Sequence, residues 1–132
     1  MSSDFEIVHG VDFVGVPTRD LPTAAAFYGE MLGLPRSVYN EERHYSEFET
    51  GNLTLSVYNP EKMGMEHNRN PNPVALHVDD VAEVRRALEQ RGVEFQGEIL
   101  DTGVCHMAFF ADPDGNALML HRRYAPRVTE QD

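Results

Sequence analysis

The feature that most constrains the fold is an internal repeat, because one strand–helix pattern occurs twice in the chain. The later copy, residues 73–92, opens with an alternation that places Val74, Leu76 and Val78 on one face of a strand. Asp80 follows as a helix N-cap, and apolar residues then recur at helical spacing. This order of residues predicts a half-buried strand that leads directly into an amphipathic helix.

The earlier copy, residues 13–33, has the same order. Asp20 is its N-cap, Pro22 lies in the first turn where a missing N–H costs nothing, and Gly33 ends the helix as Gly92 ends the later one. The two N-cap aspartates are 80 − 20 = 60 residues apart. The apolar stripe of this helix consists of Phe27, Tyr28, Met31 and Leu32.

Each copy is followed by further segments with strand patterns. In the first copy they begin near residues 38–39, 44–49 and 53–58, and in the second they span 94–100, 104–111 and 116–121. The sequence therefore predicts an α+β fold of two tandem β-α-β-β-β modules in a single domain. Module one spans about residues 10–58, a polar linker 59–72, module two about 73–122 and a tail 123–132.

One helix covers one face of each four-stranded sheet and leaves the other face bare. Two bare faces that meet form a cupped trough, which is where a function is expected. A bare face also needs cover, so we expect a homodimer. The 14-residue linker permits the two modules to pair within one chain or to exchange between two chains, and both arrangements stay open.

The amino-acid composition limits the classes of binding partner that the protein is expected to have. The net charge of −11 repels phosphate backbones, which argues against nucleic-acid binding and favours a neutral or cationic ligand. No apolar run of about 18 residues predicts a membrane span. The first ten residues lack the pattern of a secretory signal, and the single cysteine, Cys105, fits a reducing cytoplasm.

Three stretches carry a resemblance to a known family. FVGVPTRDLPTAAAFYGEMLGL, ALHVDDVAEV and FFADPDGNALML resemble the opening and closing signatures of modules in the vicinal oxygen chelate superfamily. That superfamily includes glyoxalase I, extradiol dioxygenases, and fosfomycin- and bleomycin-resistance proteins. The resemblance spans about residues 10–122 and implies the glyoxalase-like fold, a fold that hosts many chemistries.

In metal-dependent members of this superfamily, four side chains project into the trough and hold the ion. The resemblance places Phe13, Ser56, Pro73 and Met119 at those positions. Phenylalanine and proline have no donor atom, a thioether is soft, and a serine hydroxyl is a poor ligand unless ionised. We therefore expect no metal at the usual site and no cofactor.

Other polar residues share the predicted trough face. His77 and His121 have the parity of Pro73 and Met119, so they are candidates for an unusual metal site or for acid–base work, with plain structural roles as the alternative. Cys105 and His106 are adjacent on a strand and point to opposite faces, so they cannot form a thiolate–imidazole pair.

If Phe48 lies under the first helix, Tyr45 and Glu47 face the trough, where Glu47 could pair with a cation or act as a base. An aromatic and apolar lining is also expected there, suited to stacking on a planar molecule. Its expected members are Phe13, Tyr39, Tyr45, Tyr58 and Met119.

Three functions remain open. The first is a binding protein of the glyoxalase/bleomycin-resistance type that holds a hydrophobic, aromatic or cationic small molecule without metal. The second is a lyase, isomerase or dioxygenase of the same superfamily that uses relocated residues, with His77 and Glu47 as the catalytic candidates. The third is a dimerising interaction domain without a ligand. The expected ligand-binding residues are Phe13, Tyr45, Glu47, Ser56, Tyr58, His77, Met119 and His121.

Overall fold

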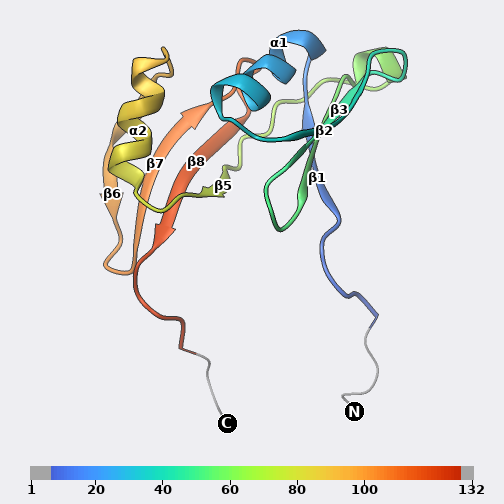
Figure 1. The fold of residues 1–132 in the computed structure, drawn as a ribbon. Helices are drawn as coiled ribbons and strands as arrows, with labels where there is room; N and C mark the ends of the chain where they lie inside the picture. Colours follow the sequence, from blue (N-terminus) through green and yellow to red (C-terminus); the bar gives the residue numbers. More distant parts are fainter. Residues whose placement is uncertain (1–6, 129–132) are drawn as a thin grey trace.

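A computed structural model describes residues 7–128 and contains two four-stranded mixed sheets, each with a helix on one face (Figure 1). The predicted α+β fold of two β-α-β-β-β units is confirmed. The first unit comprises β1 (Phe13–Pro17), α1 (Leu21–Ala26), the π-helical turn η1 (Phe27–Met31), β2 (Arg36–Asn40), β3 (Tyr45–Glu49) and β4 (Thr54–Tyr58). A short 3-10 turn η2 (Glu61–Met63) precedes the second unit, which comprises β5 (Val74–His77), α2 (Val81–Gln90), β6 (Phe95–Asp101), β7 (Cys105–Ala111) and β8 (Ala117–Arg123).

The two sheets have the same strand order. Sheet A runs β1-β4-β3-β2 and sheet B runs β5-β8-β7-β6. In each sheet the first strand of the unit pairs in parallel with the last strand, and the remaining pairs are antiparallel. Every strand therefore presents alternate side chains to its helix and to the opposite face, which we call the helix-free face.

The two helices begin in the same way. Asp20 and Asp80 have extended backbone, and each side chain accepts a hydrogen bond from the backbone N–H three residues later, at 3.2 and 3.0 Å. These contacts satisfy one of the donors that a helix N-terminus leaves unpaired. The structure thus confirms both of the N-caps that the sequence predicts.

The first helix differs from the regular helix that the sequence predicts. Its second half is the π-helical turn η1, in which the Leu32 N–H donates to the carbonyl of Phe27 at 3.0 Å. A π-turn accommodates one extra residue. Gly33 accordingly ends this helix thirteen residues after Asp20, whereas Gly92 ends α2 twelve residues after Asp80. Both glycines have a positive φ, which a residue without Cβ adopts at little cost.

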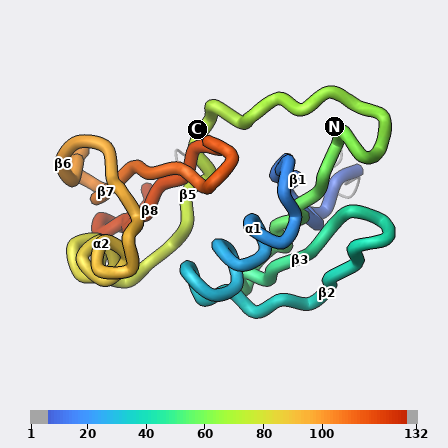
Figure 2. Tube along the Cα trace, turned by 90° about the horizontal axis from the view of Figure 1, so that it is seen from above, coloured from blue at the N-terminus to red at the C-terminus, as the bar shows by residue number. Residues whose placement is uncertain are grey.

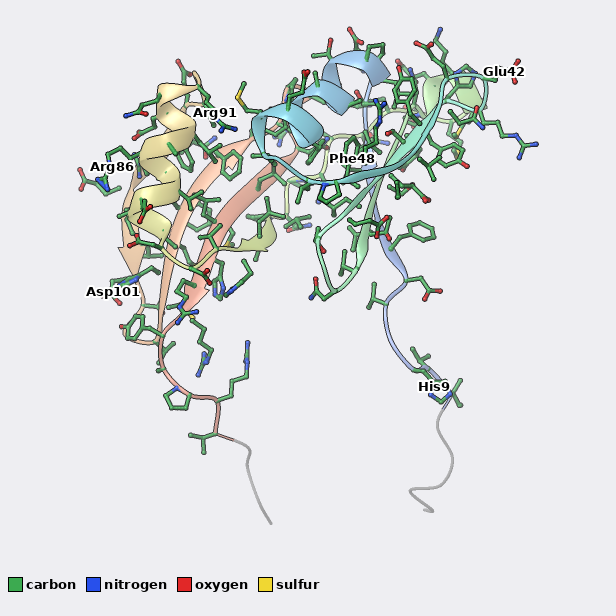
Figure 3. All side chains as sticks on the ribbon, in the orientation of Figure 1. His9, Glu42, Phe48, Arg86, Arg91 and Asp101 are labelled. Atoms are coloured by element: carbon green, nitrogen blue, oxygen red, sulfur yellow. The ribbon has the colours of Figure 1, made fainter. Side chains whose placement is uncertain are left out.

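The helix-covered faces of the two sheets face each other and share one core. The helix α1 lies between the sheets (Figure 2), with the Tyr28 ring 5.9 Å from that of Phe48 in sheet A and the Phe27 ring 6.5 Å from that of Phe110 in sheet B. Figure 3 shows Phe48 beneath α1. Buried apolar side chains from both units form a single cluster. The helix-free faces therefore do not meet within one chain.

Polar contacts fasten the two units where the β7–β8 loop reaches α1. Asp112 is 5% exposed and accepts hydrogen bonds from the Tyr28 hydroxyl at 2.6 Å and from the Asn116 amide at 2.8 Å. The same amide donates to the carbonyl of Pro17 at 2.8 Å. Arg91, at the end of α2, donates to the carbonyl of Met31 at 2.8 Å (Figure 3). The Asp112 and Asn116 groups are satisfied at depth, so they fix how the units sit together, whereas the Arg91 contact is exposed.

Two predictions concern chain ends and membranes. Parts of the predicted lead-in and tail, residues 1–6 and 129–132, lie outside the described residues. None of the described helices is long and apolar enough to cross a membrane.

Candidate functional site

The helix-free face of sheet A carries the larger share of the predicted site residues. Glu47 of β3 lies directly opposite Ser56 of β4, and Tyr45 lies opposite Tyr58. Phe48 is fully buried on the other side of β3, which is the condition on which the prediction for Tyr45 and Glu47 rested. The structure therefore brings these four side chains together on one face.

The edge strand β1 completes that face. Phe13 pairs with Thr54 beside the group and is 59% exposed, an unusual exposure for a phenylalanine. Gly15 pairs with Ser56, and a Cβ at that position would come within 3.2 Å of the Tyr58 ring. The glycine thus lets the Tyr58 ring lie across β1, and an aromatic surface extends from β4 to the sheet edge.

Two carboxylates give this face a negative charge. Glu49 accepts hydrogen bonds from the Ser37 hydroxyl and, at 2.7 Å, from the Thr54 hydroxyl, and these bonds lower the pKa of its carboxyl. The side chain of Glu47 has no hydrogen-bond or ion-pair partner among residues 7–128. Glu47 is therefore an anionic group that is available to a ligand, and Glu49 holds a second charge nearby.

The helix-free face of sheet B has a different character. His77 of β5 and His121 of β8 are direct neighbours in the parallel ladder, and Met107 flanks His121 on its other side. The His77 side chain is 68% exposed and lies 3.6 Å from the carboxylate of Asp79. Met119 lies two residues before His121 on β8, where it pairs with Ala75 of β5 and with Phe109 of β7.

Cys105 and Arg123 lie further along the same face. They are opposite each other on β7 and β8, and the Arg123 guanidinium approaches the buried cysteine sulfur at 3.9 Å. His106 points to the opposite face, and the centroid of its ring lies 4.8 Å from that of the Tyr124 ring. Arg123 and the two histidines make this face neutral to basic, in contrast to the acidic face of sheet A.

The four positions that the sequence resemblance assigns to an ion carry side chains that do not fit a metal. Phe13 and Ser56 lie on sheet A, Met119 lies on sheet B, and Pro73 immediately precedes β5, so one chain does not bring the four together. Neither hydrocarbon side chain can donate an electron pair, and a thioether and a neutral hydroxyl do not replace imidazole or carboxylate. Among the described residues there is no group of three or more His, Cys, Asp or Glu side chains that could hold an ion.

One expected lining residue was placed wrongly. Tyr39 pairs with Ser46, which is buried on the helix-covered face, and the Arg36 guanidinium stacks over the Tyr39 ring at 4.7 Å. The error arose because the parity of β2 is set by its pairing with β3, where the register shifts between Arg36 and Val38.

Sequence reasoning also missed several residues on the helix-free faces. Strand parity and register could have found them, because each lies two residues from a predicted site residue or directly opposite one. They are Glu49, Met107, Phe109 and Arg123.

Comparison with known proteins identifies the family. The sequence profile of the "Glyoxalase/Bleomycin resistance protein/Dioxygenase superfamily" matches residues 10–120. The chain belongs to this superfamily. The resemblance read from the sequence motifs is thereby confirmed. No curated protein matches the chain.

Several solved structures share the fold of this chain at low sequence identity. TnmS3, an antibiotic binding protein from Streptomyces sp. CB03234, is 24% identical over 90% of this chain and 99% of its own, with a TM-score of 0.76. Lactoylglutathione lyase from Agrobacterium tumefaciens is 17% identical over 87% and 94%, with a TM-score of 0.73. An integron cassette protein from the mobile metagenome of a Halifax Harbour sewage outfall is 21% identical over 86% and 98%, with a TM-score of 0.74. An antibiotic binder and a lyase thus share one architecture, so the fold does not select a function.

Proposed function

We propose that this protein binds a hydrophobic, aromatic or cationic small molecule on its helix-free sheet faces, without the metal of its metal-dependent relatives. The observation that carries the proposal is the set of side chains at the four ion-binding positions, which are Phe13, Ser56, Pro73 and Met119. A site that holds aromatic and thioether groups in place of metal ligands suits a molecule bound by stacking and van der Waals contacts rather than by metal coordination.

The face of sheet A supports the chemical class of the ligand. The Glu47 side chain has no partner among residues 7–128 and lies next to the Tyr45–Tyr58 pair along the β3–β4 ladder. A carboxylate next to aromatic rings attracts a cation, and the rings add stacking area for a planar molecule. TnmS3, which has a similar fold, is an antibiotic binding protein, and this supports a small-molecule ligand for a chain of this architecture.

The proposal includes a second copy of the chain. Within one chain the helix-free faces point away from the shared core, so a cup with two walls needs the sheet A face of one copy against the sheet B face of another. The charges support this pairing, with Glu47 and Glu49 on one face and His77, His121 and Arg123 on the other. Each chain then acts as a single domain in a homodimer, located in the cytoplasm as its single buried cysteine suggests.

A thermal-shift panel tests binding. Bleomycin-like antibiotics, aromatic cations and neutral aromatics are titrated against the wild-type chain and against Glu47→Gln, with Glu94→Gln as a matched exposed control. A true ligand stabilises the wild type increasingly with concentration, by about 2.7 kcal/mol at a hundred times its Kd. Glu47→Gln should weaken cationic ligands and leave neutral ones unchanged, and light scattering should give a dimer mass. No stabilisation by any compound contradicts the proposal and favours the ligand-free interaction domain.

Metal titration tests the other half of the proposal. Chelator-treated protein is titrated with zinc and with nickel in a calorimeter. We expect no tight stoichiometric binding, because the side chains at the usual positions are not ligands. A stoichiometric, tight heat signal would overturn the metal-free function.

The pairing of His77 with His121 favours one second candidate, an enzyme with relocated residues. Two imidazoles that are neighbours on one face can share acid and base roles near neutral pH, with Glu47 of another copy as a further base. Turnover of a glyoxalase-type or catechol-type substrate that His121→Ala abolishes would support this candidate. Turnover that survives both His77→Ala and His121→Ala would reject it.

A further inference from the structure

The junction between the two units has two ends that are built from equivalent parts. At one end, α1 and η1 meet the β7–β8 loop, and at the other, α2 meets the β3–β4 loop. Tyr28 and Leu88 are equivalent, because each lies eight residues after its N-cap aspartate. Asp112 and Thr50 are equivalent, because each follows its strand and its N–H donates to the carbonyl of the residue that closes the loop, at 3.0 Å in both loops.

The first end is filled. The Tyr28 ring is fully buried, and its hydroxyl reaches across the junction to Asp112 at 2.6 Å. The preceding residue, Phe27, contacts Phe110 of the other unit. Two aromatic rings and one buried hydrogen bond therefore close this side of the junction.

The second end is hollow. Leu88 takes the place of Tyr28 and Ala87 that of Phe27, so neither ring nor hydroxyl is available to reach Thr50. A cavity of about 280 Å³ remains there, and its walls come from both units. Most of its lining is aliphatic, including Val14, Leu34, Leu53, Leu76, Val84 and Leu88.

We propose that this cavity is a second binding site, for a small, uncharged and mainly apolar molecule of one or two rings or a short alkyl chain. It lies mostly on the helix-covered side of the sheets, although Ala75 and His77 of β5 also line it, and it does not depend on the proposed function. The polar groups of the lining are few, and the Thr50 hydroxyl among them already donates to the Leu53 carbonyl at 2.7 Å. The lining holds no Asp, Glu, Lys or Arg side chain, so a charged ligand or a sugar would bury polar groups against mainly aliphatic walls.

Size selects a small molecule over a protein segment. A dry apolar cavity of about 150 Å³ takes up benzene. The cavity here has a volume of about 280 Å³, which is large enough for a bicyclic hydrocarbon. An α-helix with its side chains is about 10 Å across and would not enter without separating the two units. Asn52 lies on the lining, and its amide N–H groups donate to no other described residue, so they can bond a single polar substituent of the ligand.

Naphthalene is the probe for the test. Protein labelled with carbon-13 at Leu and Val methyl groups is titrated and followed by two-dimensional NMR. We expect saturable shifts at the methyls of Leu34, Leu53 and Val84 and not at Leu21, which is buried at the start of α1 outside the lining. Leu88→Tyr, which restores the side chain of the filled end, should weaken binding by about tenfold or more. The control Ala82→Tyr adds the same ring to an exposed position of α2 outside the lining.

Each outcome decides the proposal. If Leu88→Tyr fails to fold, Val84→Phe serves as the second cavity-filling variant. Absence of saturable shifts at the cavity methyls would overturn the proposal, as would equal losses of affinity in Leu88→Tyr and Ala82→Tyr. Methyl shifts that follow protein concentration rather than naphthalene would also overturn it, since the occupant would then be another copy of the chain. Glu47→Gln should leave naphthalene binding unchanged, which separates this site from the helix-free faces.

Discussion

Module one and module two have the same strand order and the same helix N-cap, and they differ in where their helix lies. The helix of module one, with its π-turn, buries Leu21, Ala24, Ala25, Phe27 and Tyr28 between the two sheets. The helix of module two buries only Val81 and Leu88 and exposes charged residues to solvent. A repeated sequence pattern therefore gives two similar folds with unequal roles, because only one helix can occupy the centre of the shared core.

The unequal filling of the junction follows from this difference. Phe27 and Tyr28 lie in the π-turn, where Gly29 is close to Phe48, since a Cβ there would lie 3.3 Å from its ring. Their smaller equivalents, Ala87 and Leu88, lie in a regular helix, and Leu88 lines the cavity. The two repeats therefore differ at the same positions in side-chain size, in helix geometry and in how well the junction is filled.

The largest effect is expected from making module one resemble module two at a buried ring. Phe27→Ala copies Ala87 and should destabilise the chain by about 3–5 kcal/mol, because the ring is lost from a packed core. Urea unfolding followed by circular dichroism measures the change. Val104→Ala, on an exposed loop residue, is the control and should change little. A loss under about 1 kcal/mol would mean that α1 is not the centre of the core.

The hydroxyl of Tyr28 should matter next. Tyr28→Phe keeps the ring, removes one donor from buried Asp112 and should cost about 1–3 kcal/mol at neutral pH. The corresponding exchange at Tyr124, whose hydroxyl bonds an exposed Asp101, should cost much less. Equal losses in the free energy of unfolding for the two variants would show that the buried hydrogen bond contributes no more to stability than the exposed one.

The same hydroxyl predicts a pH dependence. Burial, followed by the charge of Asp112, raises the pKa of Tyr28 far above its ordinary value. The unfolded phenol ionises near pH 10 while the folded one keeps its proton, so stability is fully present below about pH 10 and falls by about 1.4 kcal/mol per unit above it. The stability difference between wild type and Tyr28→Phe should therefore shrink from pH 9.5 to pH 11. A constant difference over that range would contradict the raised pKa.

Smaller and equal effects are expected where the modules agree. Asp20→Ala and Asp80→Ala each remove one N-cap bond and should each cost about 1 kcal/mol. Thermal unfolding of both variants, with Asp20→Asn and Asp80→Asn as conservative controls, measures this. Costs that differ severalfold would mean that the two helix starts are not equivalent.

The smallest effect is expected at the exposed contact between the helices. Arg91→Ala removes hydrogen bonds to the carbonyls of Met31 and Glu30 and should cost about 0.5–1 kcal/mol, since water replaces part of them. Arg91→Lys should restore part of the loss. Hydrogen exchange at the end of η1 would report the loosening directly, and unchanged exchange there would show that the contact does not hold the junction.

Much of the fold could be read from the sequence for local reasons. Alternation in β4 and β8 fixed which side chains lie under the helix, and the aspartate and glycine signals fixed both helix ends to within a residue or two. The candidate site could be predicted from the sequence to the same extent, because strand parity placed Glu47, Tyr58 and Met119 on the helix-free faces. Parity failed for Tyr39, because β2 takes its register from β3 across a bulge and not from its own residues.

The sequence by itself determined the two β-α-β-β-β units, their caps, and the residue types at the four ion-binding positions, since periodicity, capping and donor chemistry are local properties. Only the tertiary structure decided that the helix-covered faces meet within the chain. That choice depends on how Phe27, Tyr28, Phe110 and Asp112 pack across more than 80 residues of sequence, and no local pattern encodes such a contact. The π-turn and the cavity near Leu88 belong to the same class, because both depend on the space that the other module leaves.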